Sequence, residues 1–135
     1  QAGTLSGNPI AMRAGLTTLE LVEEPGFYEA LERRSAELID GLQALADEAG
    51  VPFSTNRVGS MFGFFFAEAK PVTSFLQAKN GDNKMFRDFF LAMLRQGINL
   101  APSPFESGFI SAAHEDEEIK KTLNAANFAF KELAS

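Results

Sequence analysis

The chain has 135 residues, a hydrophobic fraction of 45% and a formal net charge of −6, which together indicate one folded domain rather than two domains or a disordered segment. The negative charge disfavours sequence-independent binding to nucleic acid and electrostatic binding to a membrane, because both need basic residues. There is no cysteine and only one histidine, so disulfides, thiolate metal sites and histidine-based metal centres are excluded.

Two helices are predicted in the first part of the chain. The first covers residues 9–24, because Pro9 suits a first helical turn and Asn8 before it is a good cap. The second covers residues 27–49, where apolar residues recur at helical spacing with charged residues between them. Gly50 follows at the position where a glycine commonly ends a helix.

The rest of the chain mixes short strands with helices. Residues 51–55 and 59–66 have the pattern of strands, and the second is apolar at nearly every position, which indicates a core or an interface. The later elements are expected as a loop, a helix, two short strands and a helix, over residues 68–83, 83–96, 98–101, 109–112 and 115–133. This order predicts an α+β fold, a small, mostly antiparallel sheet with helices packed on one side.

The segment Gly-Thr-Leu-Ser-Gly-Asn-Pro, residues 3–9, is a candidate phosphate site. Its glycines expose backbone N–H groups, and Thr4 and Ser6 add hydroxyls just ahead of a helix N-terminus, where the helix dipole favours an anion. An ordinary cap and turn uses the same residue types. Physical chemistry alone favours this second interpretation.

A second candidate is the proline- and glycine-rich loop of residues 101–109. It holds one carboxylate, Glu106, between Phe105 and Phe109, and partial desolvation by these rings would suit contact with an ammonium group. The alternative is a rigid surface turn with an exposed glutamate. The residues alone favour this second interpretation.

His114 is the only histidine, and no serine, cysteine or carboxylate stands at a spacing typical of a catalytic triad. We therefore expect a structural role for it near the start of the last helix. The acidic run Glu115 to Glu118 is interpreted as a solvated helix start rather than a metal site.

Taken in order, these segments resemble the C-terminal third of the glutamate-1-semialdehyde 2,1-aminomutases, a family of class III aminotransferase-like enzymes. The resemblance covers essentially the whole chain. A Gly-Asn-Pro turn is shared by many class III aminotransferases, whereas residues 3–9 combined with Leu100–Ser103 and Phe105–Phe109 are more specific to the aminomutases. The segments Met61–Phe66 and Gly97–Ala101 add to the likeness.

The resemblance implies a homodimer of fold type I with the active site at the subunit interface. Pyridoxal or pyridoxamine 5′-phosphate would be bound mainly by a large domain outside this chain. Gly3 and Thr4 would bind the phosphate of the cofactor held by the partner subunit, and Glu106 would lie near the substrate. The implied reaction isomerises glutamate-1-semialdehyde to 5-aminolevulinate in tetrapyrrole (porphyrin) biosynthesis, in the cytoplasm or in a plant plastid, with no nucleic-acid or membrane partner.

The resemblance also implies a division of the chain. Residues 1–24 would be a phosphate-contacting turn and a helix leading to the large domain, and residues 25–135 the small C-terminal domain. Because the chain begins at Gln1 within a motif, we expect a portion of a longer protein. No lysine stands in a Schiff-base context, so we assign no catalytic residue and expect no activity from this portion alone. The alternatives are another class III ω-aminotransferase and a free-standing, non-catalytic domain that dimerises through its Phe-rich surface.

Overall fold

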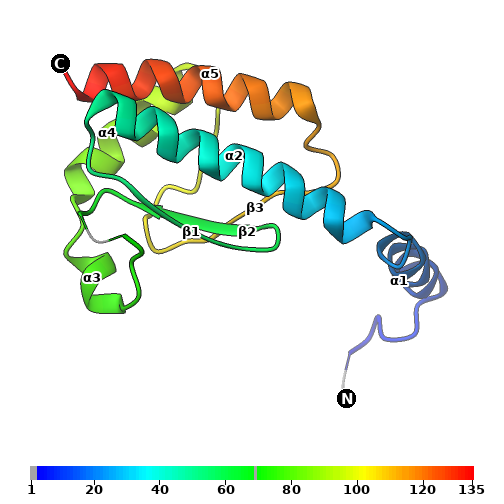
Figure 1. Cartoon of the computed structure of the whole chain (residues 1–135). Coiled ribbons are helices and arrows are strands. Elements are labelled where there is room, and N and C mark those ends of the chain that lie inside the picture. Colours follow the sequence, from blue (N-terminus) through cyan, green and yellow to red (C-terminus); the bar gives the residue numbers. More distant parts are fainter. Residues whose placement is uncertain (1–2, 69) are drawn as a thin grey trace.

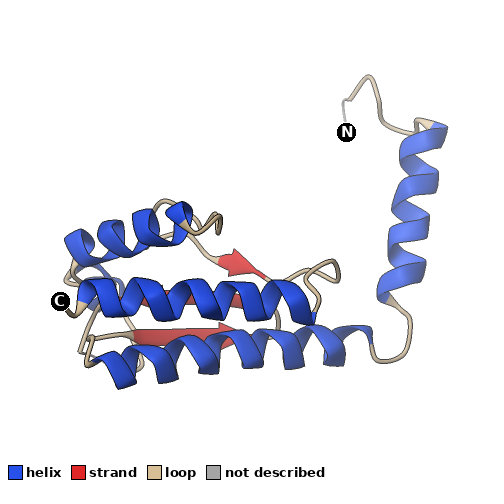
Figure 2. Cartoon of the chain, turned by 90° about the horizontal axis from the view of Figure 1, so that it is seen from above, coloured by secondary structure: helices blue, strands red, loops and turns tan. Residues whose placement is uncertain are grey.

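The computed structural model describes residues 3–68 and 70–135. Within them, a three-stranded antiparallel sheet in the order β1-β2-β3 is covered on one face by α2, α4 and α5 (Figures 1 and 2). In chain order the elements are α1 (Pro9–Val22), α2 (Phe27–Ala49), β1 (Ser54–Val58), β2 (Met61–Phe65), α3 (Phe75–Lys79), α4 (Asn83–Arg95), β3 (Gly108–Phe109) and α5 (Asp116–Leu133). The predicted α+β class, with helices on one side of a small antiparallel sheet, is confirmed.

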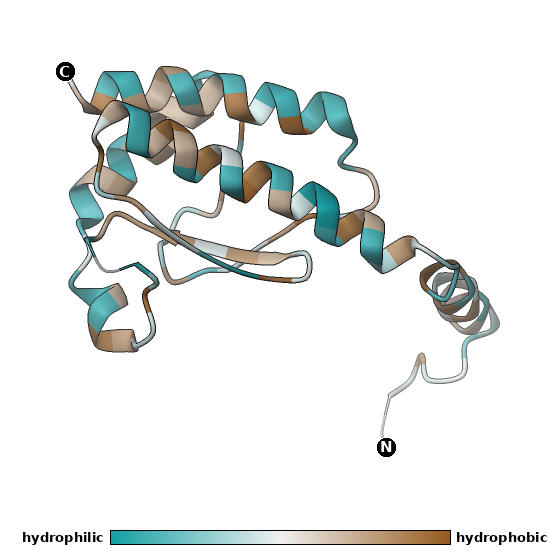
Figure 3. Ribbon diagram, viewed as in Figure 1, coloured by the Kyte–Doolittle hydropathy of each residue, from teal (hydrophilic) through white to brown (hydrophobic). Residues whose placement is uncertain are grey.

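The four long helices lie where the sequence predicts them. The side chain of Asn8 accepts hydrogen bonds from the backbone N–H groups of Ile10 and Ala11, so it caps α1. Helix α2 ends at Gly50, whose φ of 69° lies in the left-handed region that glycine adopts without strain. Hydrophilic and hydrophobic bands alternate along α2 and α5, as expected for helices with one buried face (Figure 3).

The core is built around Phe53, which is fully buried between α2 and the sheet. Its ring lies 5.1 to 6.3 Å, between centroids, from the rings of Phe64, Phe66, Phe89 and Phe130. The Phe-rich strand and the helix α4 therefore supply core residues, because large aromatic side chains bury much apolar area in edge-on and stacked contacts.

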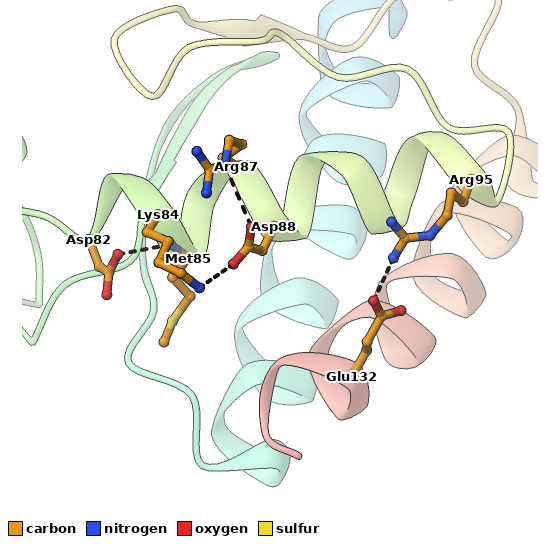
Figure 4. A network of polar contacts seen from close by, with 7 residues as sticks. All are labelled: Asp82, Lys84, Met85, Arg87, Asp88, Arg95 and Glu132. Carbon is orange, nitrogen blue, oxygen red and sulfur yellow. Dashed lines mark hydrogen bonds and ion pairs between the residues drawn. The ribbon is translucent and has the colours of Figure 1, made fainter.

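The outer side of α4 carries polar contacts (Figure 4). Asp82 caps the helix by accepting a hydrogen bond from the backbone N–H of Met85 at 2.8 Å. Lys84 pairs with Asp88 four residues later at 2.7 Å. At the other end, Arg95 pairs with Glu132 on α5 and joins the two helices across their exposed edge.

The sequence analysis placed the first strand wrongly. Residues 51–53 are not in a strand; they connect the end of α2 to β1, which begins at Ser54. Val51 and Phe53 are buried, so their apolar character reflects the core rather than a sheet position. The carbonyl of Phe53 accepts a hydrogen bond from the side chain of Gln43 on α2, at 3.1 Å, in place of a neighbouring strand.

Three further expectations differ from the structure. Residues 98–101 form no strand, because Ile98 instead donates its backbone N–H to Met93 at the end of α4. The expected loop over residues 68–83 contains the helix α3, whose N-cap is Ser74. A helix of this length is too short to show an apolar period. The expected strand over residues 109–112 is shortened and shifted to β3.

Helix α1 projects from the body formed by the other elements (Figure 2). None of its residues is buried, and Ile10 and Leu19 are 81% and 59% exposed. Most of its hydrophobic residues are therefore exposed, whereas Val22 at its end is half-buried. No helix in the described part is long and apolar enough to cross a membrane.

Candidate functional site

The turn that carries Thr4 lies ahead of α1. Backbone hydrogen bonds from Ser6 to Gly3, at 3.0 Å, and from Asn8 to Leu5, at 3.1 Å, shape this turn. Because Asn8 already binds the first N–H groups of α1, the helix N-terminus is not the open donor that the sequence pattern indicated. Thr4 is exposed, and neither its hydroxyl nor its N–H bonds to any other described residue, so both are free to bind a phosphate oxygen.

Glu106 lies in the loop between α4 and β3. A tight turn forms the loop here: the hydroxyl of Ser103 accepts from the N–H of Phe105 at 3.2 Å, and the carbonyl of Ser103 accepts from the N–H of Glu106 at 3.2 Å. The ring of Phe105 also contacts Phe75 on α3, with centroids 5.9 Å apart. The backbone of Glu106 is thus held from both sides of the loop.

Of the two interpretations of this loop, the structure agrees with the surface turn that carries an exposed glutamate. Glu106 is exposed, and Phe105 and Phe109 are themselves 53% and 61% exposed. Flanking rings desolvate a carboxylate only when they pack closely around it, so the carboxylate is open to contact from outside the chain.

Glu106 lines a cleft of about 200 Å³ between the sheet, the 98–110 segment and the start of α5. Its apolar wall includes Phe62 and Leu100, and its polar groups include Asn99, His114 and Glu118. Asn99 and Glu118 were noted only in a family likeness and in an acidic run, and no site was predicted at either. Phe62 lies far from the other residues in the chain, so the fold brings β2 to the loop and to the start of α5.

His114 has a local partner, Ser111, which the search for a catalytic triad did not reveal. His114 Nδ1 accepts a hydrogen bond from the backbone N–H of Ser111 at 3.0 Å, and the Ser111 hydroxyl lies 2.9 Å from the same nitrogen. A spacing of three residues across a tight turn has no recognised motif, so no signal in the sequence revealed the contact. The expected structural role near the start of α5 fits this geometry.

The charged residues of the described chain lie mostly on its outer surface. A hydrogen bond from Lys70 holds the pKa of Asp47 below its ordinary value, and a hydrogen bond from Lys84 does the same for Asp88. On α5, the hydrogen bond between Glu117 and Lys121 lowers the pKa of the carboxyl group and raises the pKa of the amine. These pairs are exposed and do not line the cleft.

None of the chain's lysines lines the cleft, so the described residues offer no amine for a Schiff base there. Across residues 3–68 and 70–135, no group of three or more histidine or acidic side chains is arranged to hold a metal ion. Thr4 is not among the residues that line the cleft of Glu106. The chain thus presents two separate surfaces that can contact ligands, one ahead of α1 and one on the body.

Comparisons with known proteins cover nearly the whole chain. A family model described as aminotransferase class-III matches residues 1–126. A glutamate-1-semialdehyde 2,1-aminomutase from Laribacter hongkongensis (strain HLHK9) is 53% identical over 133 residues, which is 98% of this chain and 31% of that protein.

Two solved structures share the fold. An omega-transaminase from Sphaerobacter thermophilus matches with a TM-score of 0.81 at 23% identity, over 100% of this chain and 30% of its own. A transaminase with PLP bound matches with a TM-score of 0.79 at 22% identity, over 99% of this chain and 30% of its own. The chain therefore spans less than a third of the length of the relatives it matches.

Proposed function

The chain belongs to the class III aminotransferase family, and we propose that it is the C-terminal portion of a glutamate-1-semialdehyde 2,1-aminomutase. The complete enzyme would isomerise glutamate-1-semialdehyde to 5-aminolevulinate, in tetrapyrrole biosynthesis. The observation that carries this proposal is the 53% identity to an aminomutase over 98% of the chain. The two sequence segments most specific to that family are those that hold Thr4 and Glu106.

The cofactor that we propose is pyridoxal 5′-phosphate, or its pyridoxamine form. When bound, it supplies the electron sink for moving an amino group, while the protein binds and orients the reactants. The exposed turn fits its phosphate: Thr4 offers a hydroxyl and a backbone N–H with no other partner among the described residues, and phosphate oxygens accept both. Gly3 lies in the same turn, where a Cβ atom would lie 2.7 Å from the Ser6 hydroxyl oxygen, so the turn as it stands needs a glycine there.

We assign Glu106 to the substrate. Its exposed carboxylate lies at the cleft, on a loop fixed by Ser103 and by the contact of Phe105 with Phe75. A carboxylate at this place attracts an ammonium group and orients it by charge-assisted hydrogen bonds. The aliphatic and aromatic wall beside it suits the short carbon chain of the substrate.

The remaining parts of the enzyme lie outside this chain in the proposal. The apolar side of α1 would be covered by the large domain, because large exposed apolar surfaces mark interaction sites. In the proposed homodimer, Thr4 serves the cofactor bound by the partner subunit. The isolated chain is expected to be inactive, because it has no lysine at the cleft to bind the cofactor covalently.

The test is an assay of the full-length protein, loaded with cofactor, for 5-aminolevulinate formed from glutamate-1-semialdehyde. Thr4→Val should raise the dissociation constant of the cofactor roughly tenfold, because the variant loses about one charge-assisted hydrogen bond to the phosphate. Thr18→Val is the matched control, because the Thr18 hydroxyl bonds within α1, to the carbonyl of Ala14.

For the substrate, Glu106→Gln should raise KM with the cofactor still bound. Glu117→Gln is its matched control, since Glu117 pairs with Lys121 on the outer side of α5. A full-length protein that makes no 5-aminolevulinate, and instead transfers an amino group from an external donor to a keto acid, would identify the ω-aminotransferase alternative. Formation of 5-aminolevulinate by the isolated chain would contradict the expectation that this portion alone is inactive.

A further inference from the structure

We propose that His114 is a positioning residue for Glu106, acting through the turn of residues 111–114 rather than by touching the substrate. The inference rests on the proposed function, because it concerns how the substrate-contacting loop is held. It draws on three observations: the hydrogen bonds of the His114 ring, the protonation state that they require, and the connection of this turn to the cleft.

The turn is closed from both ends. The backbone N–H of His114 donates to the carbonyl of Ser111 at 3.1 Å, and the N–H of Ser111 donates back to the Nδ1 atom of the His114 ring at 3.0 Å. Between them, the carbonyl of Ala112 accepts from the guanidinium of Arg34 on α2 at 3.3 Å. The turn is thus tied to itself and to the helix layer.

These contacts require one form of the imidazole. A backbone N–H only donates, so Nδ1 must carry a lone pair, and a doubly protonated ring, which has a hydrogen on each nitrogen, cannot make this bond. The hydrogen of the neutral ring is therefore on Nε2. The Ser111 hydroxyl also lies within hydrogen-bond distance of Nδ1, at 2.9 Å.

The turn continues the wall of the cleft, which Ile110 and His114 both line. Directly before it, Ile110 donates its N–H to the carbonyl of Ser60 at 3.0 Å, and β3 pairs with β2 only at Gly108 and Phe109. A strand this short has few hydrogen bonds of its own, so its placement depends on the segments on either side. His114 and Glu106 both line the same cleft, on opposite sides of β3 in the chain.

None of the charged side chains near the His114 ring takes over the hydrogen bond from the Ser111 N–H. Glu118 on α5 and Glu106 on the loop line the cleft with His114, and Arg34 reaches the turn from α2. Glu118 is engaged in the capping box at the start of α5, where it accepts from the N–H of Glu115. None of these groups bonds to the Ser111 N–H among the described residues, so the ring is the group that satisfies it.

The test compares two substitutions in the full-length enzyme with its cofactor bound. His114→Asn places an amide oxygen at the position of Nδ1 and can still accept from the Ser111 N–H. His114→Gln carries its oxygen one atom farther out and cannot. We expect His114→Gln to raise KM for glutamate-1-semialdehyde about tenfold, the equivalent of one lost hydrogen bond, and His114→Asn to stay within about threefold of wild type. The bound cofactor should keep its absorbance in both variants.

Ser111→Ala keeps the backbone N–H and loses only the hydroxyl, so it should also stay within about threefold. The proposal is overturned if the Asn and Gln variants are equally active. It is also overturned if His114→Asn raises KM tenfold, and this second result decides the matter if His114→Gln does not fold. A wild-type enzyme that makes no 5-aminolevulinate overturns the proposed function instead. The two failures are therefore distinguishable.

Discussion

Gly108→Ala gives a test of the close packing beside the loop that carries Glu106. Gly108 in β3 lies opposite Phe62 in β2. A Cβ atom added at Gly108 would lie 2.2, 2.5 and 2.7 Å from three atoms at the tip of the Phe62 ring. Carbon atoms pack favourably at about 3.5 to 4.0 Å, so the ring or the strand must move by more than an ångström.

The magnitude follows from this overlap. Forcing a methyl group into a packed site costs about 1–3 kcal/mol in the free energy of unfolding. Because Phe62 is half-buried and belongs to the cleft wall, part of the overlap can be relieved by turning the ring toward the cleft, at the expense of that cavity. We therefore expect a loss of about 2 kcal/mol. In the full-length enzyme the same change should raise KM for the substrate.

Urea denaturation followed by circular dichroism measures the loss of stability directly. Gly63→Ala is the matched control on the neighbouring strand, because its added Cβ would meet only Phe65 atoms, at 3.8 and 3.9 Å. It should change stability by less than about 0.5 kcal/mol. In the double variant Gly108→Ala with Phe62→Ala, the overlap is gone. The loss of stability of the double variant should therefore be smaller than the sum of the losses of the two single variants, by about 1 kcal/mol or more. Strictly additive effects would refute the steric explanation.

Three more outcomes follow from the structure. Phe53→Ala should cost about 3–5 kcal/mol in denaturant titrations, because this fully buried ring contacts four others. Asn8→Ala removes the cap of α1 and should weaken that helix by about 1 kcal/mol, measured by amide exchange at Ile10 and Ala11. Lys70→Gln should return the pKa of Asp47 toward its ordinary value in an NMR titration. Because that pKa is lowered in the folded chain, the pair of Lys70 and Asp47 stabilises the fold at pH values above the ordinary carboxyl pKa. This contribution is lost as the pH falls through the pKa of the folded chain.

The four long helices could be predicted because each carries its own signal. Asn8, Gly50 and the apolar period of α2 are local features, and the structure keeps all of them. The strands could not be placed as well, since a strand is defined by its partner. Apolar residues 51–53 and 98–101 look alike in sequence to strand residues, yet the first fill the core and the second follow a helix end. Only the tertiary structure separates these cases.

The candidate site shows the same limit in a different form. Thr4 and Glu106 stand in segments whose order resembles a known family, so both could be predicted as candidate site residues from the sequence. The contact of Phe75 with Phe105 and the bond from Ser111 to His114 depend on backbone geometry, and no spacing rule predicts them. The sequence left two interpretations of Glu106, and the structure agrees with the exposed one, because flanking aromatic residues do not by themselves bury a carboxylate.

The separation of Thr4 from the cleft bears on the proposed dimer. Between them lie α1, which buries none of its residues, and a linker in which Gly26 has a φ of 86°. The direction of α1 relative to the body is thus set by the linker rather than by packing (Figures 1 and 2). A single cofactor contacted by both Thr4 and Glu106 of one chain would require the two surfaces to converge. Two active sites shared across a dimer carry no such requirement, because one chain can lend Thr4 to its partner while Glu106 serves a separate site. The exposed apolar side of α1 is then the surface through which the rest of the enzyme fixes that arrangement.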